Sequence, residues 1–158
     1  MQFKKIGISS DHAAKDLRKM IIDFVNVLEA DVEIVDYGVG FDVNKSVDYP
    51  DYAALVAEDV AKGKLDGGIC VCGTGIGMSI AANKFQGIRA TVAWDDFSAK
   101  MSREHNNSNV LCLGARSLNH HRAVDMVKIW LETSFAGERH QMRLDKISDI
   151  EKKNFKLD

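Results

Sequence analysis

The residues best suited to chemistry in this sequence are a cysteine and the glycine-rich run that follows it. Cys72 precedes Gly73, Gly75 and Gly77, and a segment rich in helix formers comes next. Glycines before a helix leave backbone N–H groups free at the positive end of a helix dipole, where they could hold an oxyanion or a phosphate. The same position should favour the thiolate of Cys72, which could then act as a base or a nucleophile. A small buried thiol is the commoner role of cysteine, so both interpretations stay open.

The spacing of these glycines disfavours the common nucleotide-binding loops. Gly73, Gly75 and Gly77 give the pattern G-x-G-x-G, whereas the dinucleotide fingerprint needs its third glycine one residue later, where Met78 stands. The sequence also lacks the G-x-x-x-x-G-K-[ST] pattern of a Walker loop. We therefore expect no nicotinamide cofactor.

The other two cysteines allow a metal or redox interpretation, which we do not favour. Cys70 lies two residues before Cys72 on the same face of the predicted strand, but C-x-C alone lacks the second pair of ligands that zinc sites normally have. Cys112 lies inside a predicted strand and is expected in the core. We expect neither a metal nor a cofactor.

Several histidines allow both a catalytic and a structural interpretation. Asp11 and His12 follow the first predicted strand, where they could form a polarised imidazole or simply begin a helix, with Asp11 as its N-cap. His105 could carry protons, or it could only end a helix as a partner of the dipole. His120 and His121 begin a later helix and are expected at the surface.

Three arginines could bind an anionic group. Arg139 and Arg143 are four residues apart and therefore share one helical face, and together with Arg116 they could clamp a phosphate. A solvated, charged tail is the alternative for Arg139 and Arg143.

The elements that must position these residues alternate between strand and helix. We expect strands over 4–9, 32–35, 65–71, 88–93 and 110–113, with helices over 13–28, from Tyr49-Pro50 to Gly63, and over 78–84, 97–104 and 122–131. Continuous apolar strands imply burial on both faces. The predicted fold is α/β, a three-layer α/β/α Rossmann-like architecture with a five-stranded parallel sheet, whose carboxyl ends gather ligands. Asp11, His12, Cys72, His105 and Arg116 are then expected to face one crevice.

The composition limits the other possibilities. The chain has 158 residues, a formal net charge of −2 and 46% hydrophobic residues, values typical of one domain over 1–158. The charge balance argues against binding to nucleic acid or an anionic membrane surface. No apolar run reaches the roughly 18 to 20 residues that span a bilayer. An odd count of three cysteines and a start unlike a secretory leader favour the cytoplasm.

Seven motifs occur together and in one order, over roughly residues 4 to 150. They are residues 10–12 (SDH), 48–53 (DYPDYA), 72–84 (CGTGIGMSIAANK), 105–106 (HN), 109–111 (NVL), 114–116 (GAR) and 139–143 (RHQMR). Together they resemble the ribose-5-phosphate isomerases of type B, and the 72–84 block is the specific part. The resemblance implies a metal-free aldose–ketose isomerase acting on ribose 5-phosphate and ribulose 5-phosphate through an enediolate.

The resemblance also implies a role for each residue. Cys72 would be the base, with donors lent by Gly73, Gly75 and Gly77, while His105 would open the sugar ring with help from Asp11 and Thr74. The phosphate would be held by His12, Arg116, Arg139 and Arg143, and Tyr49, Asn83 and Asn106 would orient the sugar or the loop.

The family pattern further implies a homodimer or homotetramer with shared active sites, in which a C-terminal helix over about 138–155 packs on a partner subunit. A hexose 6-phosphate such as galactose or allose 6-phosphate is the alternative substrate. From other classes, a non-catalytic phosphate-binding domain and a C-x-C redox protein remain alternatives. The pentose interpretation is favoured because a single chain contains all of Cys72, His105, Arg116 and Arg139.

Overall fold

The computed structural model describes residues 3–28 and 31–155, and within these ranges five strands form one sheet. The strands are β1 (Lys5–Ser10), β2 (Glu33–Asp36), β3 (Gly67–Cys72), β4 (Ala90–Val92) and β5 (Val110–Gly114). Their order across the sheet is β2-β1-β3-β5-β4, and every neighbouring pair is parallel. The predicted five-stranded parallel sheet is confirmed.

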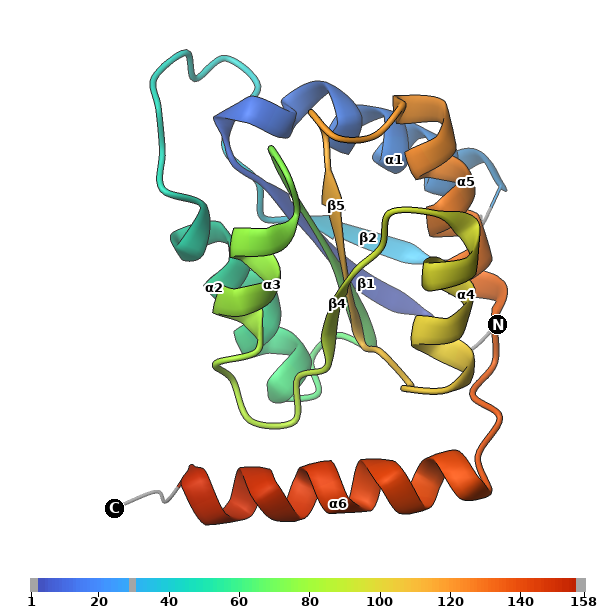
Figure 1. Ribbon diagram of the computed structural model, residues 1–158. Coiled ribbons are helices and arrows are strands. Elements are labelled where there is room, and N and C mark those ends of the chain that lie inside the picture. Colours follow the sequence, from blue (N-terminus) through green and yellow to red (C-terminus); the bar gives the residue numbers. More distant parts are fainter. Residues whose placement is uncertain (1–2, 29–30, 156–158) are drawn as a thin grey trace.

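Helices cover both faces of this sheet, as Figure 1 shows. The helices are α1 (Lys15–Leu28), α2 (Tyr49–Ala61), α3 (Ile76–Ala82), α4 (Asp96–Glu104), α5 (His120–Glu132) and α6 (Arg139–Asn154), and a 3₁₀ turn at His12–Ala14 precedes α1. Helices α1, α4 and α5 pack on one face, and α2 and α3 pack on the other. The three-layer α/β/α prediction is therefore confirmed.

The central strand β3 shows why the sequences of the strands are continuous runs of apolar residues. All six of its residues are buried. Ile69 and Val71 point into the core beneath α1, α4 and α5, whereas Cys70 and Cys72 point into the core beneath α2 and α3. A strand covered on both faces has no solvent side, so it shows no alternation of polar and apolar residues.

The strand order places a topological switch point between β1 and β3. The chain leaving β1 enters α1 on one face of the sheet, whereas the chain leaving β3 enters α3 on the other. Adjacent parallel strands whose connections diverge in this way leave a crevice at their carboxyl ends, which is where ligands bind in open α/β sheets. Asp11 and Cys72 lie at these two strand ends.

The boundaries around the glycine run differ from the prediction. Cys72 is the last residue of β3, and α3 begins at Ile76, two residues earlier than expected. Gly77 therefore lies within the first turn of α3 and not in the loop before it. Sequence periodicity missed this because glycine is a poor helix former, while the packing of α3 on β3 and β5 overrides that preference.

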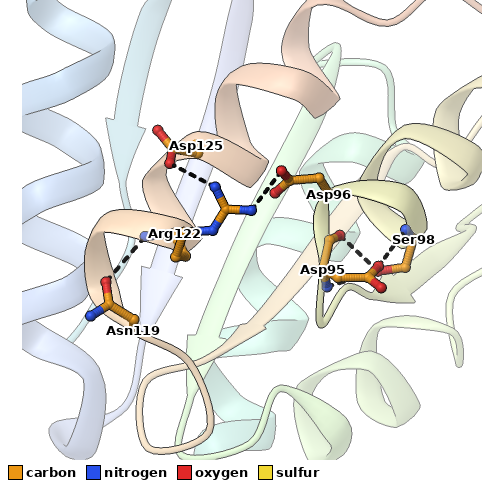
Figure 2. A network of polar contacts seen from close by, with 6 residues as sticks. All are labelled: Asp95, Asp96, Ser98, Asn119, Arg122 and Asp125. Carbon is orange, nitrogen blue, oxygen red and sulfur yellow. Dashed lines mark hydrogen bonds and ion pairs between the residues drawn. The ribbon is translucent and has the colours of Figure 1, made fainter.

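A polar network joins α4 to α5 near the carboxyl end of the sheet (Figure 2). Asp95 caps α4 by accepting the Ser98 N–H, with 2.7 Å between oxygen and nitrogen, and Asn119 caps α5. Arg122 pairs with Asp96 across the two helices, at 2.6 Å between Nη2 and Oδ2. The caps and the bridge hold the start of both helices in place.

Helix α6 crosses the edge of the sheet where the strands begin (Figure 1), with its Leu144 side chain buried. The segment before it is held by the bond from Ala136 N–H to Glu104 O, and its far end by the bond from Gly87 N–H to Glu151 Oε1. Met142, Ile147 and Ile150 on this helix are exposed. The predicted charged helix at the C-terminus is present.

Candidate active site

The site is built around Cys72 at the carboxyl end of β3. Its thiol is 4% exposed, and its sulfur accepts the backbone N–H of Gly75, with 3.2 Å between nitrogen and sulfur. The loop 73–75 thus bends back over the end of its own strand. Because the sulfur acts as the acceptor, its geometry suits a group that must take up a proton.

Gly75 makes this bend possible. Its φ is +78°, in the left-handed region, and a Cβ there would lie 3.0 Å from the carbonyl carbon of Leu113 in β5. Only glycine adopts this conformation without strain and also allows the loop to approach β5 so closely. The glycine run is therefore required by the backbone as well as by the chemistry proposed for it.

Asp11 lies beside Cys72 because their strands are neighbours. Its backbone N–H donates to Val71 O, at 3.4 Å between nitrogen and oxygen, and its side chain is 7% exposed. Asp11 Oδ1 accepts the Ala13 N–H at 2.9 Å. The N-cap interpretation of Asp11 is therefore confirmed.

His12 is held by the loop between β2 and α2. The Val47 N–H donates to His12 Nδ1, with 3.1 Å between the two nitrogens. A ring nitrogen that accepts a hydrogen bond carries no proton, so the proton of a neutral His12 is on Nε2. This imidazole therefore presents a donor and is not merely a residue of a first helical turn.

Tyr49 and Arg116 lie against opposite parts of the glycine run. A Cβ on Gly77 would meet the Tyr49 ring at 2.6 Å, so the ring packs directly over that glycine. The Arg116 N–H donates to Gly73 O at 2.9 Å, and the Arg116 side chain covers Gly73. The arginine predicted to bind phosphate thus stands beside the predicted base.

Thr74 is exposed at the tip of the same loop. Its Oγ1 accepts the Ile76 N–H at 3.4 Å between oxygen and nitrogen. Thr74 and Ile76 also line a mainly apolar cavity of about 420 Å³ that extends to Trp94 beside the edge strand β4. Trp94 is 69% exposed, so this side of the crevice is open.

The prediction that His105 faces the same crevice within one chain is wrong. His105 is the C-cap of α4, after which the chain enters β5 at Val110, paired with Gly68 at the start of β3. Cys72 pairs with Gly114 at the other end of the same two strands. A residue that precedes a parallel strand lies at the opposite edge from one that follows it.

A second polar cluster gathers around His105 at this opposite edge. Its members are His105, Arg139, His140 and Arg143, with Glu104 beside them. The imidazoles of His105 and His140 stack, with 4.2 Å between ring centroids and 10° between planes. The structure therefore separates the predicted residues into a Cys72 cluster and a His105 cluster.

The two predicted asparagines lie outside the Cys72 cluster. Asn83 caps α3, and its amide both donates to Ala90 O and accepts the Ala90 N–H, each at 2.8 Å. Its polar atoms thus anchor the edge strand β4, and we assign it no contact with a sugar. Asn106 is exposed beside His105 and lines a cavity of about 250 Å³ next to Trp94.

Comparison with known proteins agrees with this geometry. The sequence pattern of the Ribose/Galactose Isomerase family matches residues 6–147. This chain belongs to that family. It is 44% identical to ribose-5-phosphate isomerase B of Escherichia coli strain K12 over 150 residues, covering 95% of this chain and 98% of the relative.

Solved structures of family members have the same fold as this chain. Clostridium thermocellum ribose-5-phosphate isomerase B superposes with a TM-score of 0.88 at 49% identity, covering 94% of this chain and 98% of that chain. The Mycoplasma genitalium enzyme, solved with bound ribulose 5-phosphate, superposes with a TM-score of 0.87 at 40% identity, covering 95% and 97%. A ribose/galactose isomerase fold is therefore shown over nearly the whole chain.

His140 is a member of the His105 cluster to which the sequence analysis assigned no role. Burial lowers its pKa, and the nearby His105, Arg139 and Arg143 lower it further, while Glu104 opposes the shift. Its place inside the motif RHQMR was the available signal, but only the stacking on His105 shows that it belongs to the cluster. The cluster therefore concentrates positive charge.

Cys70 and Cys112 belong to the core of this isomerase. They are direct partners in β3 and β5, and both are fully buried. The hydrogen bond with Cys70, together with burial, raises the pKa of Cys112. The core prediction for Cys112 is confirmed. Within residues 3–28 and 31–155, no group of three or more His, Cys, Asp or Glu side chains could hold a metal ion.

Proposed function

We propose that this chain interconverts D-ribose 5-phosphate and D-ribulose 5-phosphate, with Cys72 as the base. The observation that carries the proposal is the position of Cys72 Sγ, which accepts a glycine-loop N–H at 3.2 Å beside the β1–β3 switch point. The relatives named for ribose-5-phosphate isomerase activity support the choice of substrate. A bound ribulose 5-phosphate in one of them supports the choice of product.

The chemistry requires one base and a set of fixed donors. Cys72 removes the proton from C2 of the open-chain aldose, and the electron pair moves to the carbonyl oxygen to form an enediolate. The thiol then returns the proton to C1 while the proton of the C2 hydroxyl moves to the C1 oxygen, which yields the ketose and restores the thiolate. Backbone N–H groups of the loop 73–75 and of the first turn of α3 stabilise the negative oxygen because they are already oriented when the charge develops.

Other residues prepare and hold the substrate. The sugar enters as a closed furanose, so a proton must move from the anomeric hydroxyl to the ring oxygen before isomerisation. We assign this transfer to His105, with Asp11 and Thr74 assisting. The phosphate is bound by His12 and Arg116 from one cluster and by Arg139 and Arg143 from the other.

We propose that a homodimer or homotetramer brings the two clusters together. Within one chain the clusters lie at opposite ends of the sheet, so neither contains the full set of groups that the reaction needs. In a symmetric pair, each Cys72 cluster receives the partner subunit's His105, Arg139 and Arg143. The positive His105 cluster then meets the sugar phosphate, an anion that balances its charge.

Exposed apolar side chains support this assembly. Trp94 and Phe97 are 69% and 71% exposed beside the open crevice, and Ile76 is 56% exposed at its edge. On α6, Ile147 and Ile150 are also exposed. Exposed apolar patches mark protein interfaces, and Trp94 shares one cavity with Phe97 and another with Ile76 beside the Cys72 cluster.

We also propose a cytoplasmic location. The three cysteines are free thiols, as expected where the surroundings are reducing. No helix among the described residues is long and apolar enough to cross a membrane.

The test is ketose formation from ribose 5-phosphate by the purified protein, in the presence of a chelator. We expect turnover by the wild type, and a loss of about a thousandfold in Cys72→Ala because general base catalysis is removed. Cys70→Ala, two residues earlier on the same face of β3, is the matched control and should keep most activity. Binding of ribose 5-phosphate should persist in Cys72→Ala.

Three outcomes would contradict the assignment. Turnover of Cys72→Ala within tenfold of the wild type would remove Cys72 as the base. Binding of ribose 5-phosphate by the wild type without turnover would favour a phosphate-binding domain. Faster turnover of a hexose 6-phosphate than of ribose 5-phosphate would replace the pentose as substrate.

A further inference from the structure

Arg18 on α1 is a buried cation that sequence patterns did not single out. Its side chain is 1% exposed, although it carries a guanidinium group. Its Nη1 donates to Ser10 Oγ at 2.9 Å, and its Nη2 donates to Val39 O at 2.7 Å. Its Nε lies 3.4 Å from Asp36 Oδ1, an ion pair that opposes the lowering of the Arg18 pKa by burial.

These partners come from three different segments. Ser10 ends β1 immediately before Asp11, Asp36 ends β2, and Val39 lies in the loop 37–48 that joins β2 to α2. The Phe41 ring of the same loop covers the guanidinium, with 4.3 Å from its carbon to the ring centroid. Arg18 therefore ties the loop to the strand that carries Asp11.

Lys15, one turn earlier on α1, extends this attachment. Its Nζ donates to Phe41 O at 3.1 Å and to Val43 O at 2.7 Å. Together with Val39 O, three alternate carbonyls of the loop are thus bound by two cations of one helix. The loop contains no helix or strand, so its carbonyl groups need other hydrogen-bond donors. Lys15 and Arg18 provide these donors.

Gly38 is the position at which the loop accommodates Arg18. A Cβ on Gly38 would lie 1.5 Å from Arg18 Nη1, so any other residue there would displace the guanidinium. At Gly40, two residues further on, a Cβ would meet only the side chains of Asp42 and Val43. Of these two glycines, only Gly38 lies against the guanidinium.

The far end of the same loop reaches the substrate site. Val47 donates its N–H to His12 Nδ1, and Tyr49 packs over Gly77. The bond to Nδ1 keeps the proton of His12 on Nε2, which leaves Nε2–H as the donor available to a phosphate oxygen. The position of the loop thus decides which nitrogen of His12 can donate.

We propose that Arg18 is a positioning residue for the sugar-phosphate site: it holds the loop 37–48 so that the Val47 N–H fixes His12 with Nε2–H toward the substrate. The proposal rests on the proposed function for its activity readout. Arg18 does not touch the sugar. Its loss should weaken binding of substrate and transition state alike, because the phosphate is bound equally in both.

The main test compares Arg18→Met with Arg18→Lys. We expect Arg18→Met to raise KM for ribose 5-phosphate at least tenfold with kcat changed less than about threefold, the pattern of lost uniform binding. Arg18→Lys keeps a charge but not the guanidinium fork, so it should recover only part of the loss. Lys19→Met removes the neighbouring exposed cation on α1 and is the matched control, with unchanged kinetics.

A spectroscopic measurement follows the link to His12 directly. Imidazole nitrogen NMR signals, assigned to His12 by their loss in His12→Gln, should show a proton on Nε2 in the wild type. In Arg18→Met the two tautomers should both be populated. A purely structural role for Arg18 would lower the unfolding temperature without changing these signals.

A second variant keeps the proposal testable if Arg18→Met does not fold. Gly38→Ala retains Arg18 but displaces its guanidinium, so it should reproduce the rise in KM, whereas Gly40→Ala should not. Three results with folded Arg18→Met or Gly38→Ala would overturn the proposal. They are a KM within twofold of the wild type, a fall in kcat alone, and unchanged His12 signals. If the wild type shows no turnover, the proposed function fails, and the His12 signals still decide this inference.

Discussion

Two glycines in this chain share a backbone conformation but differ in their surroundings. Gly75 and Gly87 have φ values of +78° and +79°. A Cβ on Gly75 would press against the backbone of Leu113, whereas a Cβ on Gly87 would meet nothing within 4 Å. Comparing them separates the cost of the left-handed conformation from the cost of disturbing the loop over Cys72.

We predict that alanine at either glycine lowers the free energy of unfolding by at least about 1 kcal/mol, because a Cβ strains the left-handed conformation. Gly75→Ala should cost more than Gly87→Ala, since Leu113 must also move. Only Gly75→Ala should reduce turnover, by at least about tenfold, because it shifts the N–H that contacts Cys72 Sγ. Urea unfolding and ketose formation measure the two effects, and equal turnover in both variants would contradict the role given to this loop.

At the scale of elements, side-chain contacts join segments that the sheet does not pair. Tyr37 follows β2 directly and its hydroxyl donates to Asp59 Oδ2 on α2, with 2.7 Å between the oxygens. Asp59 also pairs with Lys64 at 2.9 Å. The pKa of Tyr37 is raised to about 12 by burial, by the hydrogen bond to Asp59 and by the charge of Asp59. The contact ties the start of the loop 37–48 to the helix at its other end.

This contact predicts a stability difference at alkaline pH. The pKa of Tyr37 is raised in the folded protein, so the bond stabilises fully below the unfolded pKa of about 10 and is lost as the pH rises toward 12. Between these values the free energy of unfolding should fall more steeply for the wild type than for Tyr37→Phe. Urea unfolding at several pH values measures this, and parallel curves would contradict the assignment.

At the scale of the whole molecule, the separation of the two clusters within one chain leads us to expect sites shared between subunits. The prediction concerns mixtures of two inactive variants, Cys72→Ala and Arg139→Ala. In a mixed dimer with sites shared between subunits, one site carries both substitutions and the other carries neither. Random reassociation should therefore restore about a quarter of wild-type activity, since half of the dimers are mixed and each has one intact site.

The measurement is ketose formation after the two variants are unfolded together and refolded. Each variant refolded alone is the control and should remain inactive. A mixture as inactive as its components would mean that Cys72 and Arg139 act within one chain, which would contradict the proposed assembly. Sedimentation velocity on the same samples reports whether a dimer or tetramer has formed.

The sequence by itself determined the elements and the Cys72 cluster. Apolar strands alternating with amphipathic helices predict a parallel sheet. Asp11 and Arg116 follow strands and Cys72 ends one, so such a sheet brings all three to its carboxyl edge. The start of α3 was misplaced because glycine's low helix propensity was overridden by packing.

Only the tertiary structure decided the strand order β2-β1-β3-β5-β4, the place of His105 and the role of Arg18. Strand order and the burial of a cation depend on packing between segments that are distant in the chain. Such packing produces no periodic pattern of residues in the local sequence. His105 shows the physical reason most clearly, because it precedes β5 and the direction of that parallel strand places it at the edge of the sheet opposite Cys72.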